Sequence, residues 1–346
     1  MNGLRAMHAL YIGQLWHGGT CLERLRVLGE AGWTLTPFDI TPYLRSTNRL
    51  MASMQHRLLW GPDVARFNRD VARIARTIGR LDVVWIDKGR WLLADVLDEI
   101  KMATAAIAVH YTPDPAFTVH HSRHFLGCLP YYELCLTTKR YEIETYARHG
   151  ARETLFTLQG IDDRFERLHA CAWLDGRTID LMFIGHREPY YERVLAAARL
   201  ASGSLRVHGP GWSRPGKKTS WRGVAAGPVW GDDYARALAQ ARIGLGLLFK
   251  MCPDAFTTRS FEIPASGAML LAERTTEHQA LFKEDHEAVF FGSHEELRDK
   301  ISFYLRNEGA RRAIAAAGRA RALGQYHWRH VSQPAIRRTE EIARAR

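Results

Sequence analysis

Short apolar runs alternate with amphipathic stretches along this chain, and this alternation constrains the fold more than any other feature. In the first half, the runs ALYIG and LDVVWIDKG are separated by segments such as TCLERLRVLGEAG, whose apolar residues recur at helical spacing. Parallel strands that are covered by helices produce this pattern. A second series runs from IDLMFIG to AVFFG. The sequence therefore predicts an α/β fold with two doubly wound parallel sheets.

A polar, charged segment at 162–178 separates the two series, and we interpret it as the linker between two domains. The chain has 346 residues, of which 46% are hydrophobic and 25% charged, and this suffices for two separate cores. We expect a Rossmann-like N-terminal domain over residues 1–165 and a Rossmann-like C-terminal domain over residues 175–325. Residues 326–346 are expected to form a helix that can cross back to the N-terminal domain.

Composition argues against a membrane-spanning protein and leaves the partner open. No apolar stretch approaches the roughly 20 residues that span a bilayer, and the N-terminus lacks the pattern of a signal peptide. The five cysteines are scattered without a CxxC pair, so we expect reduced thiols in a cytoplasmic protein. The formal net charge of +11 is spread without a dense basic block. It suits nucleotide diphosphates, acidic glycans or anionic lipid surfaces, and we expect no nucleic-acid partner.

The most informative stretch is DAFTTRSFEIPASGAMLLAE, which begins at Asp254. Its pattern predicts a polar loop, a short helix that ends at Gly267, and an apolar strand. The start of such a helix presents free N–H groups and the positive end of the helix dipole, so it favours an anion. Thr257, Thr258 and Arg259 lie there and offer two hydroxyls and a guanidinium to phosphate oxygens.

Two carboxylates, Asp254 and Glu262, flank the expected anion site. Each can accept hydrogen bonds from the hydroxyls of a sugar or a ribose. The alternative is that Asp254 caps the helix and Glu262 is a solvated charge. Pro264 favours a functional geometry, because a proline inside a helix costs about 3 kcal/mol unless the geometry is required.

Residues 257–318 resemble the C-terminal domain of CgeB-like glycosyltransferases, a group within the two-domain GT-B superfamily. The spacing of Asp254 and Glu262 is similar to the acidic motif of glycosyltransferase family 4, in which both residues are usually Glu. The resemblance implies a GT-B fold, with two parallel sheets facing each other across a cleft, and a nucleotide-diphosphate sugar as donor. It also implies that residues 1–165 form the acceptor domain and residues 175–325 the nucleotide-sugar domain. It implies that Glu262 binds the ribose and that Asp254, with its shorter side chain, contacts the transferred sugar.

The resemblance extends upstream of this segment. Arg187 and Arg193 take the places of basic residues that approach the diphosphate, and Lys250 lies at a strand end that faces the cleft. Trp230 would lie beside the nucleobase. Solvated arginines and ordinary packing of the tryptophan are the alternative interpretations.

Fewer candidates lie in the N-terminal half. The sequence WHGGT resembles the first loop of such enzymes, where Gly18 and Gly19 would let backbone amides approach the donor phosphates, although a tight turn explains them as well. The sequence AVHYTPDP resembles the strand end that faces the donor from the other side. His110 and Asp114 are therefore candidates for activating the acceptor or holding the sugar. A packed histidine and a turn residue are the alternatives.

No metal or cofactor is expected. The sequence has no Asp-x-Asp pair placed like a metal-binding donor site, and the adjacent Asp232 and Asp233 begin a predicted helix, where acids are favoured anyway. Fixed amides and the basic residues named above can stabilise the departing diphosphate in place of a metal.

The sequence thus predicts a metal-independent glycosyltransferase that acts with retention on a glycan, a lipid-linked molecule or another small acceptor. Alternatives are a nucleotide-sugar epimerase or hydrolase of the same superfamily, an inverting transferase, and a nucleic-acid-binding protein without enzymatic activity. The basic residues 310–346 are either a solvated helix or a peripheral contact with the inner face of a membrane.

Overall fold

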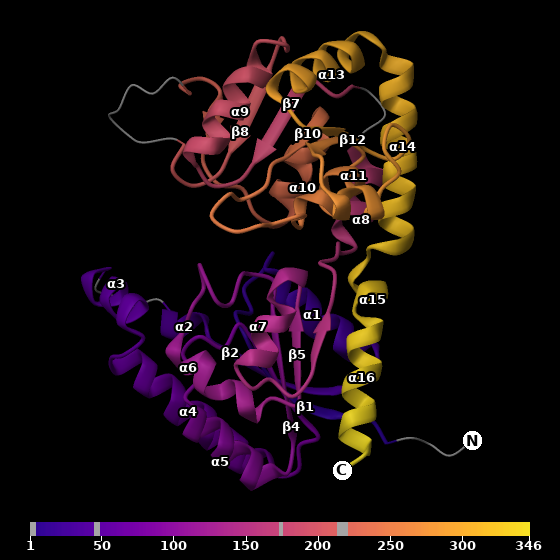
Figure 1. The fold of residues 1–346 in the computed structure, drawn as a ribbon. Helices are drawn as coiled ribbons and strands as arrows, with labels where there is room; N and C mark the ends of the chain where they lie inside the picture. Colours follow the sequence, from indigo (N-terminus) through magenta and orange to yellow (C-terminus); the bar gives the residue numbers. More distant parts are fainter. Residues whose placement is uncertain (1–4, 45–48, 173–175, 213–220) are drawn as a thin grey trace. The chain divides into compact units, whose positions relative to one another are not determined.

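The computed structural model describes residues 5–44, 49–172, 176–212 and 221–346 (Figure 1). Two compact units make up the chain: the first joins Met1–Leu158 with Trp328–Arg346, and the second consists of Gln159–His327. The chain therefore leaves the first unit, forms the second, and returns to the first with its last residues.

The first unit is built on a parallel sheet of six strands in the order β2-β1-β3-β4-β5-β6. Successive side chains of a strand point to opposite faces. In β1, Leu10 and Ile12 belong to one hydrophobic core, and Ala9 and Tyr11 belong to another. The sheet is therefore buried on both faces. Its strands are β1 His8–Gly13, β2 Thr34–Asp39, β3 Val83–Asp87, β4 Ile107–Thr112, β5 Leu134–Thr137 and β6 Thr154–Phe156.

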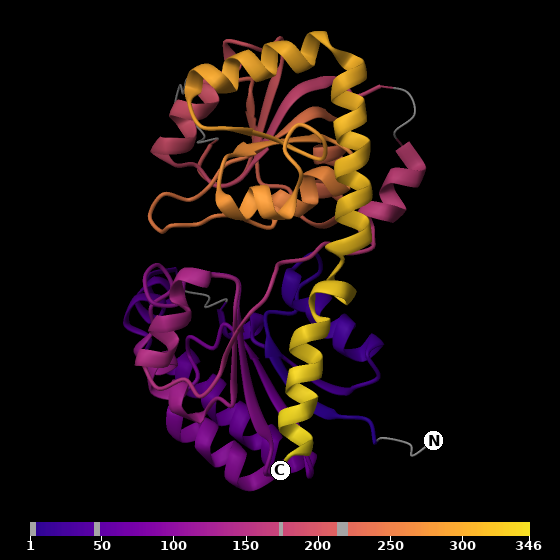
Figure 2. The same cartoon turned by 45° about the vertical axis from the view of Figure 1, so that its right-hand side comes forward.

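Helices α4, α5 and α6 cover one face of this sheet, and α1 and α16 cover the other (Figures 1 and 2). Phe67 of α4 lies in the first core, whereas Val27 of α1 and Ile336 of α16 lie in the second. The C-terminal tail thus completes the core of the first unit. Its helices are α1 Thr20–Glu30, α2 Thr41–Leu44, α3 Arg49–Leu58, α4 Pro62–Ile78, α5 Ala94–Thr104, α6 Arg123–Cys128, α7 Ile143–Arg148, α15 Trp328–Val331 and α16 Gln333–Arg344, with 3-10 turns at Leu129–Tyr131 and Arg140–Glu142.

The second unit contains another parallel six-stranded sheet, in the order β12-β11-β10-β7-β8-β9. Tyr191 and Leu195 of α9 and Leu297 of α13 belong to one hydrophobic core of this unit, and α11 and α14 contact β11. Its elements are α8 Arg164–Ala172, β7 Ile179–Ile184, α9 Pro189–Arg199, β8 Leu205–His208, β9 Ala225–Ala226, α10 Gly231–Ala239, β10 Ala241–Gly246, α11 Arg259–Ala265, β11 Met269–Glu273, α12 Thr276–Leu281, β12 Val289–Phe291, α13 His294–Arg306 and α14 Glu308–Gln325.

Two parallel sheets confirm the predicted α/β class, but the segment at 162–178 is not simply a linker. Arg164–Ala172 forms α8, which contacts α10 and α11 within the second unit. Its residue Phe165 is buried, and this apolar contact outweighs the polar character of the segment. The predicted linker therefore belongs in large part to the second unit.

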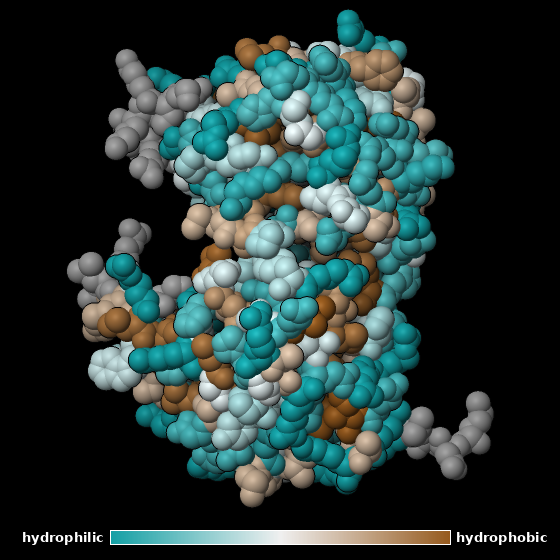
Figure 3. Space-filling model, in the orientation of Figure 1, coloured by the Kyte–Doolittle hydropathy of each residue, from teal (hydrophilic) through white to brown (hydrophobic). Residues whose placement is uncertain are grey.

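The polarity of the surface side chains differs between the outer helices. In Figure 3 the side chains over α13 and α14 are largely hydrophilic, whereas apolar side chains gather at the surface around α3.

Among the described helices, none is long and apolar enough to cross a membrane. Cys21, Cys128, Cys135 and Cys252 are buried and form no disulfide, and Cys171 lies outside the residues whose side chains are described.

Candidate functional site

Arg259 ties together the carboxyl ends of two central strands in the second unit. Its guanidinium donates from Nη1 to the carbonyl oxygen of Ile184 at 3.1 Å and from Nη2 to that of Leu247 at 2.8 Å. A Cβ atom at Gly185 would lie 2.8 Å from the same Nη1. Glycine at this position therefore leaves the space that the guanidinium occupies.

Glu262 lies one turn further along α11 and is the carboxyl group most altered by its surroundings. The Tyr234 hydroxyl of α10 donates to its Oε2 at 2.5 Å. Burial raises the pKa of Glu262 to about 7, although this hydrogen bond and the nearby Arg164 oppose the shift. The carboxyl group is therefore close to half-ionised at neutral pH. An arriving hydroxyl donor would stabilise its charged form.

A chain of hydrogen bonds through Ser260 and His278 holds the loop before α11. The Thr257 amide donates to Ser260 Oγ at 3.1 Å, and this oxygen lies 2.8 Å from His278 Nε2. The other nitrogen of His278 lies 2.7 Å from the Glu273 carbonyl oxygen, and burial lowers the pKa of His278, so the ring is neutral. Thr258 donates its hydroxyl to Gln159. These hydrogen bonds fix the start of α11 against the end of β11.

Thr257 and Asp254 also lie near the start of α11. The buried Thr257 hydroxyl has no hydrogen-bond partner among the described residues. Asp254 is half-buried in a turn in which its amide donates to the Cys252 carbonyl oxygen at 2.8 Å. The loop before α11 and the first turn of this helix therefore carry four of the predicted donor residues: Asp254, Thr257, Arg259 and Glu262.

Lys250 joins a second polar group at the same edge of the sheet. Its ammonium pairs with Glu273 at the end of β11 and lies 4.7 Å from the centre of the Tyr190 ring. Glu273 also accepts hydrogen bonds from the Leu248 amide at 2.7 Å and from the Tyr190 hydroxyl at 2.9 Å. The Lys250 charge is therefore neutralised locally while its side chain stays about half exposed.

The other predicted donor residues lie at the surface. Arg187 follows β7 and donates to Glu192, with 2.6 Å between its Nε and Oε1. Arg193 is exposed on α9, with its guanidinium 6.0 Å from the Tyr190 ring centre. Trp230 directly precedes α10 and is 57% exposed. Exposure of Trp230 does not fit the packing alternative, whereas the ion pair of Arg187 is compatible with a solvated position.

The first unit places its predicted glycines in a tight turn after β1. Gly18 has a φ of 90°, in the left-handed region that favours glycine, and Gly19 precedes α1. The Gly19 amide donates to the Trp16 carbonyl oxygen at 3.0 Å, and a Cβ atom at Gly19 would lie 2.9 Å from the Trp16 indole nitrogen. The local geometry thus requires small residues whether or not a phosphate binds there.

His110 is fully buried on β4, which favours the packing alternative. Its ring lies 4.6 Å from that of Phe125 and 5.2 Å from that of Tyr132, measured between ring centres. Its Nε2 lies 3.2 Å from the Lys88 carbonyl oxygen. Burial lowers the pKa of His110 to about 4, so the ring is neutral at pH 7. A residue in this position supports its neighbours and does not reach solvent.

Asp114 stays ionised at the end of β4. Burial acts to raise its pKa, but the ammonium of Lys88, 2.6 Å away, and the nearby His120 outweigh this effect and lower it. Opposite charges also raise the pKa of Lys88. Asp114 and Lys88 are therefore both charged near neutral pH.

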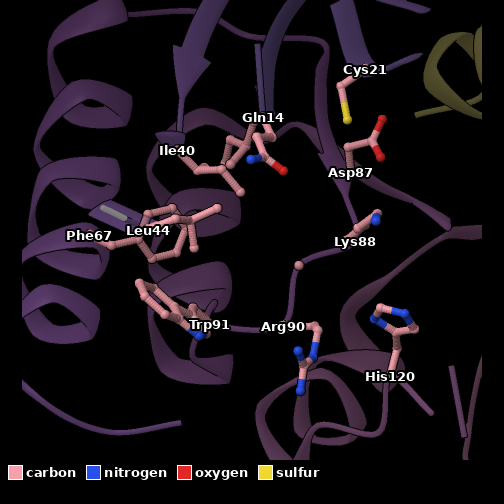
Figure 4. A pocket seen from close by; sticks show the side chains of 12 residues that line it. Gln14, Cys21, Ile40, Leu44, Phe67, Asp87, Lys88, Arg90, Trp91 and His120 are labelled. Carbon is pink, nitrogen blue, oxygen red and sulfur yellow. The ribbon is translucent and has the colours of Figure 1, made fainter. Parts of the chain in front are cut away.

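A cavity of about 160 Å³ adjoins this pair in the first unit (Figure 4). We call it the first-unit cavity. It lies at the carboxyl ends of β1 and β3. Side chains that line it include Ile40, Leu44, Phe67, Trp91, Lys88, Arg90 and His120.

Sequence reasoning missed most of these partners. In the second unit, Tyr234 contacts Glu262 and Glu273 pairs with Lys250. In the first unit, Lys88 and Arg90 line the first-unit cavity. The sequence carried one usable signal, because LDVVWIDKG ends a buried strand with charged residues, where ligands often bind. Within the described part of the chain, no group of three or more His, Cys, Asp or Glu side chains could hold a metal ion.

Comparisons with known proteins concern the family and the fold of the chain. Residues 187–337 match a family described as glycosyl transferase-like. No protein of curated function matches the sequence.

Solved glycosyltransferase structures share the fold at low sequence identity. Sucrose-phosphate synthase from Thermosynechococcus elongatus is 13% identical, with 98% of this chain and 100% of that chain covered and a TM-score of 0.67. Trehalose 6-phosphate synthase from Burkholderia multivorans is 10% identical, with coverage of 99% and 100% and a TM-score of 0.66. Anabaena Alr3699/HepE, in complex with UDP and glucose, is 13% identical, with coverage of 97% and 100% and a TM-score of 0.61. The chain thus shares the GT-B fold of these structures, and residues 187–337 are similar to a glycosyl transferase-like family.

Proposed function

We propose that this protein transfers a sugar from a nucleoside diphosphate sugar to an acceptor hydroxyl, and that its second unit binds the donor. The observation that carries the proposal is Glu262. Its carboxyl group is held by Tyr234 in surroundings that raise its pKa to about 7, inside the segment that matches the glycosyl transferase-like family. Ionisable groups with such shifts concentrate at functional sites.

Donor binding follows from the chemistry of the groups at this edge of the sheet. Glu262 accepts hydrogen bonds from the ribose hydroxyls, and Asp254 accepts them from the transferred sugar. The diphosphate meets Arg187, Arg193 and Lys250, together with the Thr257 hydroxyl and amides near Thr258 and Arg259. Trp230, exposed beside α10, supplies a flat apolar surface to the base.

The reaction exchanges one bond for another. The bond between the anomeric carbon and the diphosphate oxygen breaks, and its electron pair leaves with the nucleoside diphosphate. The acceptor oxygen bonds to the anomeric carbon and loses its proton to solvent or to a carboxylate of the protein, for which Asp114 is the candidate. We propose retention at the anomeric carbon and no metal, because cationic side chains can stabilise the departing charge.

UDP-glucose is the first donor to test, since Alr3699/HepE, which shares the fold, holds UDP and glucose. The acceptor belongs to the glycans, lipid-linked molecules or other small molecules. The CgeB-like subtype also belongs to this proposal, as does peripheral contact of the basic tail with a membrane.

A turnover assay tests the function. The protein is incubated with a panel of nucleotide sugars and glycan or lipid-linked acceptors in EDTA, and nucleoside diphosphate release and the product anomer are followed by NMR. We expect acceptor-dependent release and a retained anomer. The exposed Glu308→Ala variant should behave like the parent, and Glu262→Ala should lose at least tenfold in rate. Donor conversion that is independent of any acceptor would instead favour an epimerase or hydrolase, and an inverted anomer would exclude retention.

A further inference from the structure

The first-unit cavity has two chemically different sides (Figure 4). Ile40, Leu44, Phe67 and Trp91 form an apolar wall, which comes from the end of β2, from α2, from α4 and from the segment after β3. Lys88, Arg90 and His120 lie opposite this wall. The cavity therefore offers an apolar surface to one part of a ligand and hydrogen-bond donors to another.

An unusual backbone turn sets the positions of Lys88 and Arg90 at the first-unit cavity. Lys88 has a φ of 66° and Gly89 a φ of 59°, so two successive residues adopt the left-handed conformation. A side chain at Gly89 would clash, since a Cβ atom there would lie 2.8 Å from Ile86 Cγ2. The left-handed conformation is unfavourable for a residue with a side chain such as Lys88, and such outliers concentrate at functional sites. The turn places the Lys88 and Arg90 side chains at the cavity on either side of Gly89.

The one carboxylate among the described residues that line the cavity is already engaged. Asp87 Oδ2 accepts hydrogen bonds from Tyr11 at 2.7 Å and from Arg24 Nε at 2.8 Å, and its Oδ1 accepts a second hydrogen bond from Arg24 at 2.9 Å. Lys88 pairs with Asp114 outside this lining. Lys88, Arg90 and His120 add hydrogen-bond donors to this lining, and the two cationic side chains among them favour an acceptor-rich anion.

Size restricts the apolar part of the ligand. The volume of about 160 Å³ is close to that of an engineered protein cavity of about 150 Å³ that binds benzene. The space therefore accommodates a single ring or a branched alkyl group of similar size, and it is too small for a disaccharide.

We propose that the first-unit cavity binds the acceptor through a ring-sized apolar group whose carboxylate or phosphate points toward Lys88 and Arg90. The ligand class is thus an apolar acid with a hydroxyl outside the cavity that receives the sugar. This assignment rests on the proposed function only in identifying the occupant as the acceptor. Binding of the apolar acid itself is independent of donor chemistry.

Matched ring compounds test the charge preference in the full-length protein without nucleotide. Isothermal titration measures benzoate, phenyl phosphate, neutral benzyl alcohol and cationic benzylamine, with acetate and inorganic phosphate as ringless probes. We expect benzoate or phenyl phosphate to bind at least tenfold more tightly than benzyl alcohol, because a charge-assisted hydrogen bond contributes more than a neutral one. The better of the two anions identifies the acid. Equal binding of charged and neutral rings, binding of ringless anions as tight as that of the ring acids, or no binding would overturn the proposal.

Variants locate the binding and control for folding. Arg90→Gln should weaken the ring anion about tenfold and leave benzyl alcohol unchanged, which shows that the cavity is intact. Leu44→Trp should abolish binding of all ring compounds by filling the apolar wall. The control Arg69→Gln removes a charge from the exposed side of α4 and should have no effect. An unchanged affinity of Arg90→Gln for both ring anions contradicts the assignment.

UDP binding on the same proteins separates the two proposals. Loss of ring binding with retained UDP affinity refutes only the cavity assignment. Ring binding without affinity for any nucleoside diphosphate refutes the donor proposal and leaves the cavity. If both bind, 4-(hydroxymethyl)benzoate and its phosphate analogue should stimulate UDP release from UDP-glucose more than a neutral diol of the same size. Equal stimulation by the neutral diol contradicts the acceptor role.

Discussion

At the residue scale, Glu262 carries the central chemical claim, because a buried carboxyl group is costly unless something stabilises it. Tyr234 supplies one hydrogen bond at 2.5 Å. Burial nevertheless raises the pKa of Glu262 to about 7 from its ordinary value of 4.5. The folded protein therefore holds this proton more tightly than the unfolded chain does.

This difference makes stability depend on pH. The contribution of protonated Glu262 is complete below pH about 4.5 and is lost as the pH rises through about 7, and the loss of this single contribution amounts to up to about 3 kcal/mol. Glu262→Gln cannot titrate, and its free energy of unfolding should gain on that of the wild type as pH rises. Urea denaturation between pH 5 and 8 measures the effect. The exposed Glu308→Gln should show a constant offset, and a constant offset for Glu262→Gln as well would contradict the shift.

A second residue-scale prediction concerns the buried Arg24–Asp87 pair behind the first-unit cavity. Their side chains are 4% and 0% exposed, so loss of one partner leaves an uncompensated buried charge. Arg24→Met should lower the free energy of unfolding of the first unit by about 3–5 kcal/mol. The exposed pair Arg76–Glu99 provides the control, and Arg76→Met should cost less than about 1 kcal/mol. Equal costs in denaturant titrations would show that burial does not govern these pairs.

The sequence predicted part of the second-unit site and little of the first-unit cavity. Arg259 and Glu262 could be singled out because a helix start and a fixed spacing are local features. Tyr234 could not, since its contact with Glu262 depends on how α10 packs against α11 over a separation of 28 residues. Lys88 and Arg90 escaped notice because the left-handed turn between them is not visible in an apolar pattern.

At the element scale, α14 contacts α11 and β11, and its residue Gly318 lies close to Pro264 of α11 and to the backbone at Glu287. A Cβ atom at Gly318 would lie 2.2 Å from the Glu287 carbonyl oxygen and 3.4 Å from Pro264. Close approach, and not backbone conformation, explains this glycine. The same helix contains Gly309 and Gly324, at which a Cβ atom would meet nothing within 4 Å.

These glycines form a matched set of substitutions. Gly318→Ala should destabilise the second unit by about 1–3 kcal/mol, because overpacking forces the backbone apart. Gly309→Ala and Gly324→Ala should be neutral or stabilise it by up to about 1 kcal/mol through higher helix propensity. Thermal unfolding of the three variants measures the contrast. Three equal shifts would mean that α14 does not pack as described.

Elements with a clear periodicity were predictable, and those defined by packing were not. The apolar runs of β1 and β3 identify buried strands, and the two parallel sheets confirm the fold class. Helix α8 was missed because only Phe165 and its neighbours reveal an apolar side, within a segment rich in charge.

At the scale of the whole molecule, the two ends of the chain share one core. Trp328 is 2% exposed and belongs to the same core as Ala9 and Val83 of the first unit. Arg338 pairs with Glu153 at 2.7 Å in this unit. At least one basic side chain of the tail, that of Arg338, is therefore engaged in an ion pair within the first unit.

Removal of the Trp328 side chain should therefore unfold residues far away in sequence. Trp328→Ala should lower the stability of the first unit by about 3–5 kcal/mol, the cost of a large core truncation. Hydrogen exchange of the β1 and β3 amides reports this unit directly. The control Trp60→Ala, at a residue 69% exposed in the same unit, should change stability by less than about 0.5 kcal/mol. Unchanged exchange in Trp328→Ala would refute a shared core.

Calorimetric titration of UDP, ADP and GDP into the protein in EDTA tests the central claim most directly, with Glu262→Ala and Glu308→Ala measured alongside. We predict that at least one nucleoside diphosphate binds without metal, that Glu262→Ala weakens this binding by tenfold or more, and that Glu308→Ala leaves it unchanged. Equal affinity in the wild type and Glu262→Ala, or no binding of any nucleoside diphosphate, would contradict the account.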